Sequence, residues 1–193
     1  GPPTGKSTLL RLKAPEKVTC SSTPLELEIF LDDLEARPLK LEGINQGLRG
    51  FQIQIHYDPS VLQAESASLG SALASIDVDG DGVIPPWAPA GPHIDNEAGT
   101  AFFGGLALIT GPGQSEDPGP DPVARGAPIL LGAVQFRTVG EGSAQLSSSR
   151  LLLLAGGAET YQGSVAAGQV SVGAGPCAAR LASMSSRESG RPC

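Results

Sequence analysis

Three aspartates stand at every second position of the segment 76–87, IDVDGDGVIPPW, and this spacing suits a metal ion. Asp77, Asp79 and Asp81 occupy the positions of the first three side-chain ligands of a calcium loop, and the carbonyl of Val83 falls where such a loop contributes a backbone oxygen. Ca²⁺ prefers hard oxygen ligands of this kind. The segment therefore predicts a structural calcium ion, and we expect no other cofactor.

The segment departs from a complete EF-hand loop at its end. Ala88 stands where the loop needs a bidentate acid, and Pro85 and Pro86 prevent the helix that would follow. We expect a reduced loop, completed by water or by the carboxylate of Asp95 or Glu97 and filled in an extracellular setting. The alternative is an acidic, glycine-rich turn without metal, because Asp and Gly favour tight turns.

Residues that commonly carry catalysis are few and scattered. His56 alternates with apolar residues, and His93 lies in a proline-rich stretch. The acids Glu65, Asp95 and Glu97 can be combined into pairs, but nothing in their spacing sets the separation of about 5 to 10 Å that glycoside hydrolysis needs. The sequence has no nucleophile elbow and no Cys-x-x-Cys pair. We therefore predict that the chain is not an enzyme.

Aromatic residues make up 4% of the chain, and Trp87 is its one tryptophan. Because an exposed ring stacks well on the CH face of a sugar, Trp87 is a candidate carbohydrate contact. A lone tryptophan beside prolines is more typical of a side chain that pins a loop onto its domain.

Short segments with period-two alternation account for most of the remaining chain. The 26 glycines and 17 prolines interrupt helical patterns but leave such segments intact. We predict an all-β domain of eight or nine strands, in a sandwich or jelly roll. The strand candidates are 8–14, 25–31, 51–57, 61–68, 100–109, 129–139, 143–154 and 168–173.

Composition also predicts the ends of the domain. We expect a flexible arm at 1–7, a folded domain at 8–173 and a disordered tail at 174–193. Within the domain, an acidic insert at 76–92 and a long Pro/Gly-rich loop at 111–128 interrupt the strands. The three cysteines, Cys20, Cys177 and Cys193, allow one disulfide that closes the ends and one odd thiol, but their number does not define the pairing.

The charge of the chain argues against nucleic acid as a partner. Its net charge is −7 and its pI is about 4.8, and no stripe of Lys and Arg is present to replace counterions on a phosphate backbone. No apolar run approaches the roughly 20 residues of a membrane-spanning helix. Because the first residues lack an apolar signal segment, we expect any export signal to have been removed.

One outward row is a candidate protein-binding surface. If residues 51, 53, 55 and 57 face the core, then Gln52, Gln54 and His56 form a neutral outward row. We expect Gln135 and Arg137 to join this row from a later strand. The alternative is a solvated sheet face without a partner, which is common in antiparallel sheets.

Four segments of the chain carry motifs in a definite order. The most specific lies in GLRGFQIQIHYDPSVLQAESASLG (47–70), where an aromatic and alternating apolar residues precede Tyr-Asp-Pro-x-x-Leu. The others are HIDNEAGTAFFGGLAL (93–108), GAPILLGAVQFRTVGEGSAQLSSSRLLL (126–153) and the closing strand GQVSV (168–172). In this order the segments resemble cohesin modules and the related carbohydrate-binding module superfamily.

The resemblance implies a nine-stranded jelly-roll β-sandwich from a secreted or cell-surface protein that acts by binding. It further implies a dockerin-like protein partner, which would meet the sheet that carries Gln52, Gln54 and His56, and a monomeric domain within a larger protein. The alternatives are a carbohydrate-binding module that takes part in polysaccharide degradation through Trp87, and a structural spacer domain.

Overall fold

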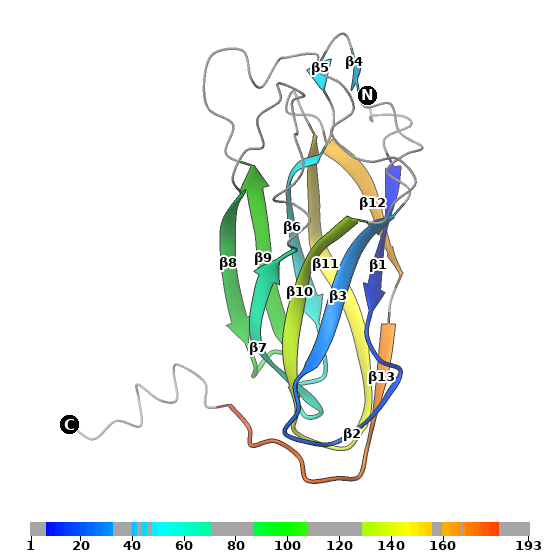
Figure 1. Ribbon diagram of the computed structural model, residues 1–193, viewed down its shortest axis with the longest axis vertical. Coiled ribbons are helices and arrows are strands. Elements are labelled where there is room, and N and C mark those ends of the chain that lie inside the picture. Colours follow the sequence, from blue (N-terminus) through cyan, green and yellow to red (C-terminus); the bar gives the residue numbers. More distant parts are fainter. Residues whose placement is uncertain are drawn as a thin grey trace, which may run out of the picture.

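The computed structural model describes residues 7–32, 40–41, 44–45, 48–70, 87–107, 129–155, 160–166 and 168–181. Within these ranges the chain forms strands and no helix (Figure 1), and so offers no helix with the length and hydrophobicity that a membrane crossing requires. In chain order the strands are β1 (Ser7–Lys13), β2 (Lys17–Thr19), β3 (Leu25–Asp32), β4 (Lys40–Leu41), β5 (Ile44–Asn45), β6 (Leu48–His56), β7 (Leu62–Leu69), β8 (Trp87–Asp95), β9 (Thr100–Ala107), β10 (Ile129–Thr138), β11 (Gly142–Ala155), β12 (Thr160–Ala166) and β13 (Gly168–Gly173).

The main strands form two layers that pack face to face. We call one the β3 layer, made of β7, β10, β3 and β1 in that order, and the other the β6 layer, made of β11, β6, β9 and β8. In Figure 1, β3 and β10 pass in front of the fainter β6 and β11. Rings from the two layers meet between them, since the centroid of Tyr57, just after β6, lies 4.9 Å from that of Phe136 on β10. The layers thus share one core.

Close packing between the layers depends on a glycine in β10. A Cβ on Gly132 would lie 2.7 Å from Cε2 of Phe103 on β9 and 2.6 Å from the carbonyl oxygen of Ser68 on β7. Because a real side chain cannot approach so closely, the absence of a Cβ lets the Phe103 ring pack on the opposite layer.

The first and last strands join the layers along one side. β1 runs parallel to β12, with Leu10 opposite Val165, and β2 runs parallel to β13, with Val18 opposite Val172. Both β12 and β13 also pair with β11 of the β6 layer. β1 and β2 can be counted as one interrupted strand, and β12 and β13 as another. With the small β4–β5 hairpin set aside, the described residues then form nine strands. The predicted jelly-roll sandwich is confirmed.

The period-two alternation of the sequence produces the core. On β3, the side chains of residues 25, 27, 29 and 31 are all buried, while Phe30 faces outward beneath the guanidinium of Arg11, 4.6 Å from its Cζ. On β6, the buried residues are Phe51, Ile53 and Ile55. Burial of each such side chain contributes about 1.5 to 3 kcal/mol to the free energy of unfolding, which fixes the register of both strands.

The turn after β6 explains why Tyr57-Asp58-Pro59 is the most specific block of the sequence. Oδ1 of Asp58 accepts hydrogen bonds from the backbone N–H (2.9 Å) and the hydroxyl (2.6 Å) of Ser60, and these bonds hold the pKa of Asp58 below its ordinary value. The N–H of Tyr57 donates to the carbonyl of Gly99 at 2.9 Å. Gly99 has φ of +75°, and a Cβ there would lie 2.1 Å from the Tyr57 carbonyl oxygen. Only glycine fits this position without strain.

All eight predicted strand segments are present, as β1, β3, β6, β7, β9, β10, β11 and β13. The prediction that 87–92 belong to a loop insert is wrong, because these residues start the edge strand β8. Pro89 and Pro92 have no backbone N–H to donate. A strand tolerates them at a sheet edge, where one side of its backbone needs no hydrogen-bond partner. The rest of the acidic insert, the loop 111–128 and residues 1–6 of the predicted arm lie outside the described residues.

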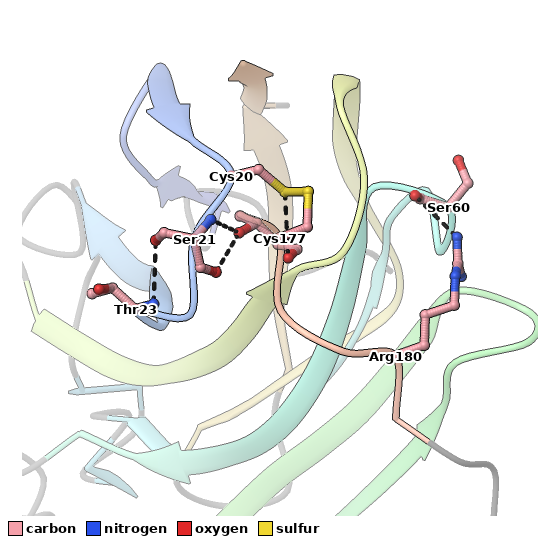
Figure 2. The surroundings of a disulfide bond; sticks show 7 residues. Cys20, Ser21, Thr23, Ser60, Cys177 and Arg180 are labelled. Carbon is pink, nitrogen blue, oxygen red and sulfur yellow. Dashed lines mark hydrogen bonds between the residues drawn. A yellow bond between two sulfur atoms is a disulfide. The ribbon is translucent and has the colours of Figure 1, made fainter. Parts of the chain in front are cut away.

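The predicted disordered tail is wrong for residues 174–181, which we call the C-terminal strap. A disulfide joins Cys177 to the buried Cys20, 157 residues earlier (Figure 2). The N–H of Ala178 donates to the carbonyl of Thr138 at 2.9 Å, and the guanidinium of Arg180 donates to the carbonyl of Ser60 at 3.3 Å. Residues 182–193, including Cys193, lie outside the described residues.

Candidate interaction surface

The predicted polar row lies on the outer side of the β6 layer. Gln52, Gln54 and His56 are partly exposed and alternate with the buried residues of β6. Since β6 pairs with β11 on one side and β9 on the other, the row lies in the middle of its sheet. Nε2 of His56 lies 2.6 Å from Oγ of Ser149 on β11. We call this outer surface the β6 face.

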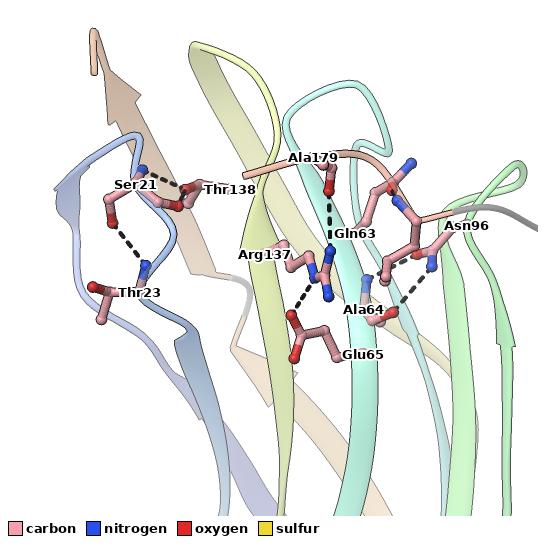
Figure 3. Close-up of polar contacts among 10 residues, drawn as sticks. Ser21, Thr23, Gln63, Ala64, Glu65, Asn96, Arg137, Thr138 and Ala179 are labelled. Carbon is pink, nitrogen blue, oxygen red and sulfur yellow. Dashed lines mark hydrogen bonds and ion pairs between the residues drawn. The ribbon is translucent and has the colours of Figure 1, made fainter. Parts of the chain in front are cut away.

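Gln135 and Arg137 do not join the row, and that part of the prediction is wrong. Both lie on β10, in the β3 layer, whose outward side chains face away from the β6 face because the core separates the two layers. The side-chain amide of Gln135 donates to Glu26 on β3, and Arg137 pairs with Glu65 on β7 (Figure 3). Sequence alternation gives the side of each strand but does not show which strands share a layer.

An aromatic ring that the sequence analysis did not single out lies at the centre of the β6 face. Phe102 on β9 is opposite Gln54 on β6 and His93 on β8. The Cζ of Arg150 on β11 lies 4.4 Å from the centroid of the Phe102 ring, and the imidazole of His93 stacks on it at 6.3 Å with an interplanar angle of 21°. Phe102 is therefore flanked by a cation from the β11 side and an imidazole from the β8 side.

Arg150 reaches this ring because β11 contains a bulge. Ser149 is opposite Gln54 and Leu152 is opposite Gln52, so two residues of β11 face one residue of β6. Leu151 packs against the core, while Arg150 is exposed and has φ of 52°. A residue with left-handed φ at such a bulge is usually glycine. Here an arginine occupies the position, and Nη1 donates to Oε1 of Gln54 at 3.3 Å.

The β6 face also contains exposed apolar surface and a hollow. Leu106 on β9 is 48% exposed and is the one large apolar side chain of the described residues that is exposed to this extent. Beside Phe102 lies an open hollow of about 740 Å³, which is lined by Gln54, His93, Asp95, Thr100, Phe102 and Arg150. Aromatic and arginine side chains such as Phe102 and Arg150 are enriched among the residues that contribute most of the binding energy in protein interfaces.

The outer side of the β3 layer has a different character. There Arg137 pairs with Glu65, and Arg11 lies over Phe30. Nη1 of Arg137 also donates to the carbonyl of Ala179 in the C-terminal strap at 3.2 Å. This surface is thus partly covered by the chain itself.

Trp87 lies where the anchor interpretation expected it, against the core. Its ring centroid is 6.5 Å from that of Phe51, and its Nε1 is buried with no hydrogen-bond partner among the described residues. Trp87 is opposite Ala107, in the inward register of β8. The residue keeps a partly exposed surface, and its role as a carbohydrate contact stays a prediction.

The predicted calcium ligands Asp77, Asp79, Asp81 and Val83 lie outside the described residues, so the calcium site stays a prediction. Elsewhere, the described part of the chain has no cluster of three or more His, Cys, Asp or Glu that could hold a metal ion. Oδ1 of Asp95, a suggested further ligand, accepts the N–H groups of Glu97 and Ala98, each at 3.0 Å. One oxygen of Asp95 is thus used to form the β8–β9 turn.

Sequence reasoning missed Phe102, His93, Arg150 and Leu106 as members of one surface. Part of the signal was present, because the adjacent phenylalanines 102 and 103 of a strand must point to opposite faces, so one of them is outward. The bulge at Arg150 left no such signal, since no glycine marks it.

No family model matches the sequence, and neither does any curated protein. Solved structures do match the fold. A cohesin module from a family 33 glycoside hydrolase of Clostridium perfringens has a TM-score of 0.59 and 9% identity, over 87% of this chain and 98% of that one. A type II cohesin bound to an X-dockerin, from Acetivibrio cellulolyticus, has a TM-score of 0.58 and 11% identity, over 86% and 99%.

A type I cohesin in complex with a dockerin, from Clostridium thermocellum, has a TM-score of 0.55 and 8% identity, over 86% of this chain and 94% of that one. At such identities the likeness establishes shared architecture. The four segments that resemble cohesins in sequence include β6, β7, β9, β10, β11 and β13 of the sandwich. The fold of this chain is therefore the cohesin fold, a jelly-roll β-sandwich that covers nearly the whole length of the cohesin modules it matches.

Proposed function

We propose that this chain is a non-catalytic protein-interaction module whose β6 face binds a dockerin-like partner. The observation that supports this most strongly is the group of Phe102, Arg150 and His93 on an open sheet face, which also carries the exposed Leu106 four residues further along β9. Arginine and aromatic residues are among the residue types that contribute most of the binding energy in protein interfaces. Several structures with this fold are cohesins in complex with dockerins.

A binding role also fits the chemistry of the described residues. The candidate acids are engaged elsewhere, because Glu65 pairs with Arg137 and Asp95 accepts the backbone amides of its turn. His56 bonds to a serine hydroxyl, and His93 stacks on a phenylalanine. The contact between His56 and Ser149 does join a base to a hydroxyl, but among the described residues no third group bonds to the other imidazole nitrogen to orient it, as covalent catalysis requires.

We further propose that the module works outside the cell. The disulfide between Cys20 and Cys177 closes most of the domain. Disulfides persist in oxidising compartments and are rare in the reducing cytosol. Secretion or display on the cell surface accounts for this cross-link.

The proposal is tested by titration calorimetry against a panel of type I and type II dockerins, with a pair of matched variants. Gln52→Lys adds a charge at the centre of the β6 face, opposite Leu152 and Gly104, and breaks no contact that the structure records for Gln52. Gln135→Lys adds the same charge on the other side of the sandwich, beside Glu26. We expect Gln52→Lys to weaken the tightest dockerin by at least about tenfold and Gln135→Lys to leave it within about twofold.

Two results would count against the proposal. One is the absence of binding by every dockerin of the panel at concentrations up to about 100 µM, where a specific module of this size is expected to bind. The other is equal loss of affinity in the two variants. Thermal unfolding of each variant, compared with the wild type, shows that the fold is retained.

A further inference from the structure

Arg150 differs from the other outward residues of the β6 layer in its backbone. It is the extra residue of the β11 bulge, and its φ of 52° is a conformation that side chains other than glycine, Asn and Asp rarely adopt. A glycine would fit the bulge with less strain. Strained positions that persist in a fold are concentrated at binding sites.

The bulge determines where the guanidinium of Arg150 lies. Without the extra residue, the position after Ser149 would be the core residue opposite Ile53. With it, Leu151 packs against the core, and Arg150 extends over the ring of Phe102 at 4.4 Å. The strand thus places a cation at the centre of the sheet face, at the edge of the hollow.

Arg150 keeps hydrogen-bonding capacity in this position. A guanidinium carries five N–H donors, and within the described part of the chain its one hydrogen-bond acceptor is Oε1 of Gln54, at 3.3 Å. Stacking on Phe102 holds the planar group while leaving donors at its edge, a geometry that suits a carboxylate bound by two parallel hydrogen bonds. Asp95, the acid that lines the hollow, is at the turn end of β8, where Oδ1 binds two backbone amides.

We infer that Arg150 is an anchor that binds a carboxylate side chain of the partner, next to an apolar contact on Phe102. The partner segment is therefore acidic at one position and apolar beside it. This inference rests on the β6 face being the interaction surface, and it names the chemistry that this surface recognises.

The test uses two blocked tripeptides as probes, one with a central glutamate between leucines and the other with glutamine in its place. Chemical shifts of the isotope-labelled protein are followed during titration. We expect the glutamate peptide to shift the Arg150 Nε–H and the Phe102 signals, with a dissociation constant of about 1 to 10 mM, and the glutamine peptide to bind about tenfold more weakly.

Two variants of Arg150 separate binding from folding. Arg150→Gly relieves the strained φ while removing the guanidinium, so we expect a melting temperature within about 3 °C of the wild type and no preference for glutamate. Arg150→Lys keeps the charge but not the planar fork, so we expect an intermediate preference. The matched control is Arg11→Gln, because Arg11 also lies over a phenylalanine, Phe30, but on the β3 layer. This control should retain the full preference.

The inference is overturned if both peptides bind equally, if the preference survives Arg150→Gly, or if the shifts cluster around Arg11 and Phe30. Its failure is distinct from failure of the proposed function. Dockerin binding that is lost in Gln52→Lys but unchanged in Arg150→Gly removes the inference alone. A glutamate preference that depends on Arg150, together with no dockerin binding, removes the proposed function alone.

Discussion

At the scale of single residues, Tyr57 and Asn96 connect three parts of the chain. The Tyr57 hydroxyl donates to Oδ1 of Asn96 at 2.6 Å, and the same oxygen accepts the N–H of Ala64 at 2.8 Å. Nδ2 of Asn96 donates to the carbonyl of Ala64 at 3.0 Å (Figure 3). One side-chain amide thus binds the backbone of β7 much as a neighbouring strand would, at an edge that no described strand pairs with.

Burial of Tyr57 makes the free energy of unfolding depend on pH in the alkaline range. Its pKa is raised from 10.0 to about 12, mainly because burial disfavours the phenolate. A group whose pKa is raised by folding contributes stability that is complete below pH 10 and is lost as the pH rises toward 12. The unfolded state then releases its proton first, so the free energy of unfolding falls across this range.

The prediction concerns Tyr57→Phe, compared with the wild type by urea unfolding. Near pH 8 we expect the variant to be less stable by about 1 to 2 kcal/mol, because a buried hydrogen bond is lost. Near pH 11 the difference should shrink by about 1 kcal/mol, because only the wild type loses the contribution of the buried phenol. A difference that stays constant between the two pH values would contradict this account of Tyr57.

The residues of the interaction surface show what alternation can and cannot predict. Gln52, Gln54 and His56 were correctly placed outward, because a buried strand face fixes the side of every residue. The prediction that Gln135 and Arg137 join the same row is wrong, because the alternation of side chains along a strand does not show which layer that strand joins. Phe102 and Arg150 meet only through pairing of β6 with β9 and β11, where the residues around Gln54 lie about 50 and about 100 residues away along the chain.

At the scale of elements, the C-terminal strap is held by contacts that composition did not reveal. The N–H of Leu181 donates to the buried side chain of Gln63 at 2.6 Å, and Arg180 donates to the carbonyls of Pro59 and Ser60. Small, polar, aperiodic residues normally indicate disorder, because they bury too little apolar surface to order the backbone. Here the disulfide and side-chain donors replace that missing burial (Figure 2).

We predict that removal of the disulfide destabilises the domain strongly. The chain-entropy model for a closed loop of 157 residues gives a contribution of about 5 kcal/mol, and measured values for such cross-links usually fall between about 2 and 5 kcal/mol. The double variant Cys20→Ala/Cys177→Ala should therefore unfold at a markedly lower urea concentration than the wild type. Cys193→Ser is the matched control and should leave the transition unchanged. Equal stability of the double variant and the control would contradict a structural role of this disulfide.

At the scale of the whole molecule, the two outer sides of the sandwich differ. On the β3 layer, Arg137 pairs with Glu65 and donates to the carbonyl of Ala179 in the C-terminal strap. On the β6 layer, the guanidinium of Arg150, the imidazole of His93 and the ring of Phe102 line an open hollow, and Leu106 is exposed further along β9. Local alternation predicted the strands and the sandwich, but the parallel pairing of the first and last strands, which closes the layers, depends on contacts across the whole chain.

The most direct test of the central claim is hydroxyl-radical footprinting of the module with and without its tightest dockerin. This method reports the solvent exposure of individual side chains, and both sides of the sandwich offer reactive ones. We predict strong protection of Phe102, Leu106 and His93 on the β6 face, and unchanged reactivity of Phe30 on the β3 layer. Protection of Phe30 with unchanged reactivity of Phe102 and Leu106 would contradict the assignment of the β6 face as the binding surface.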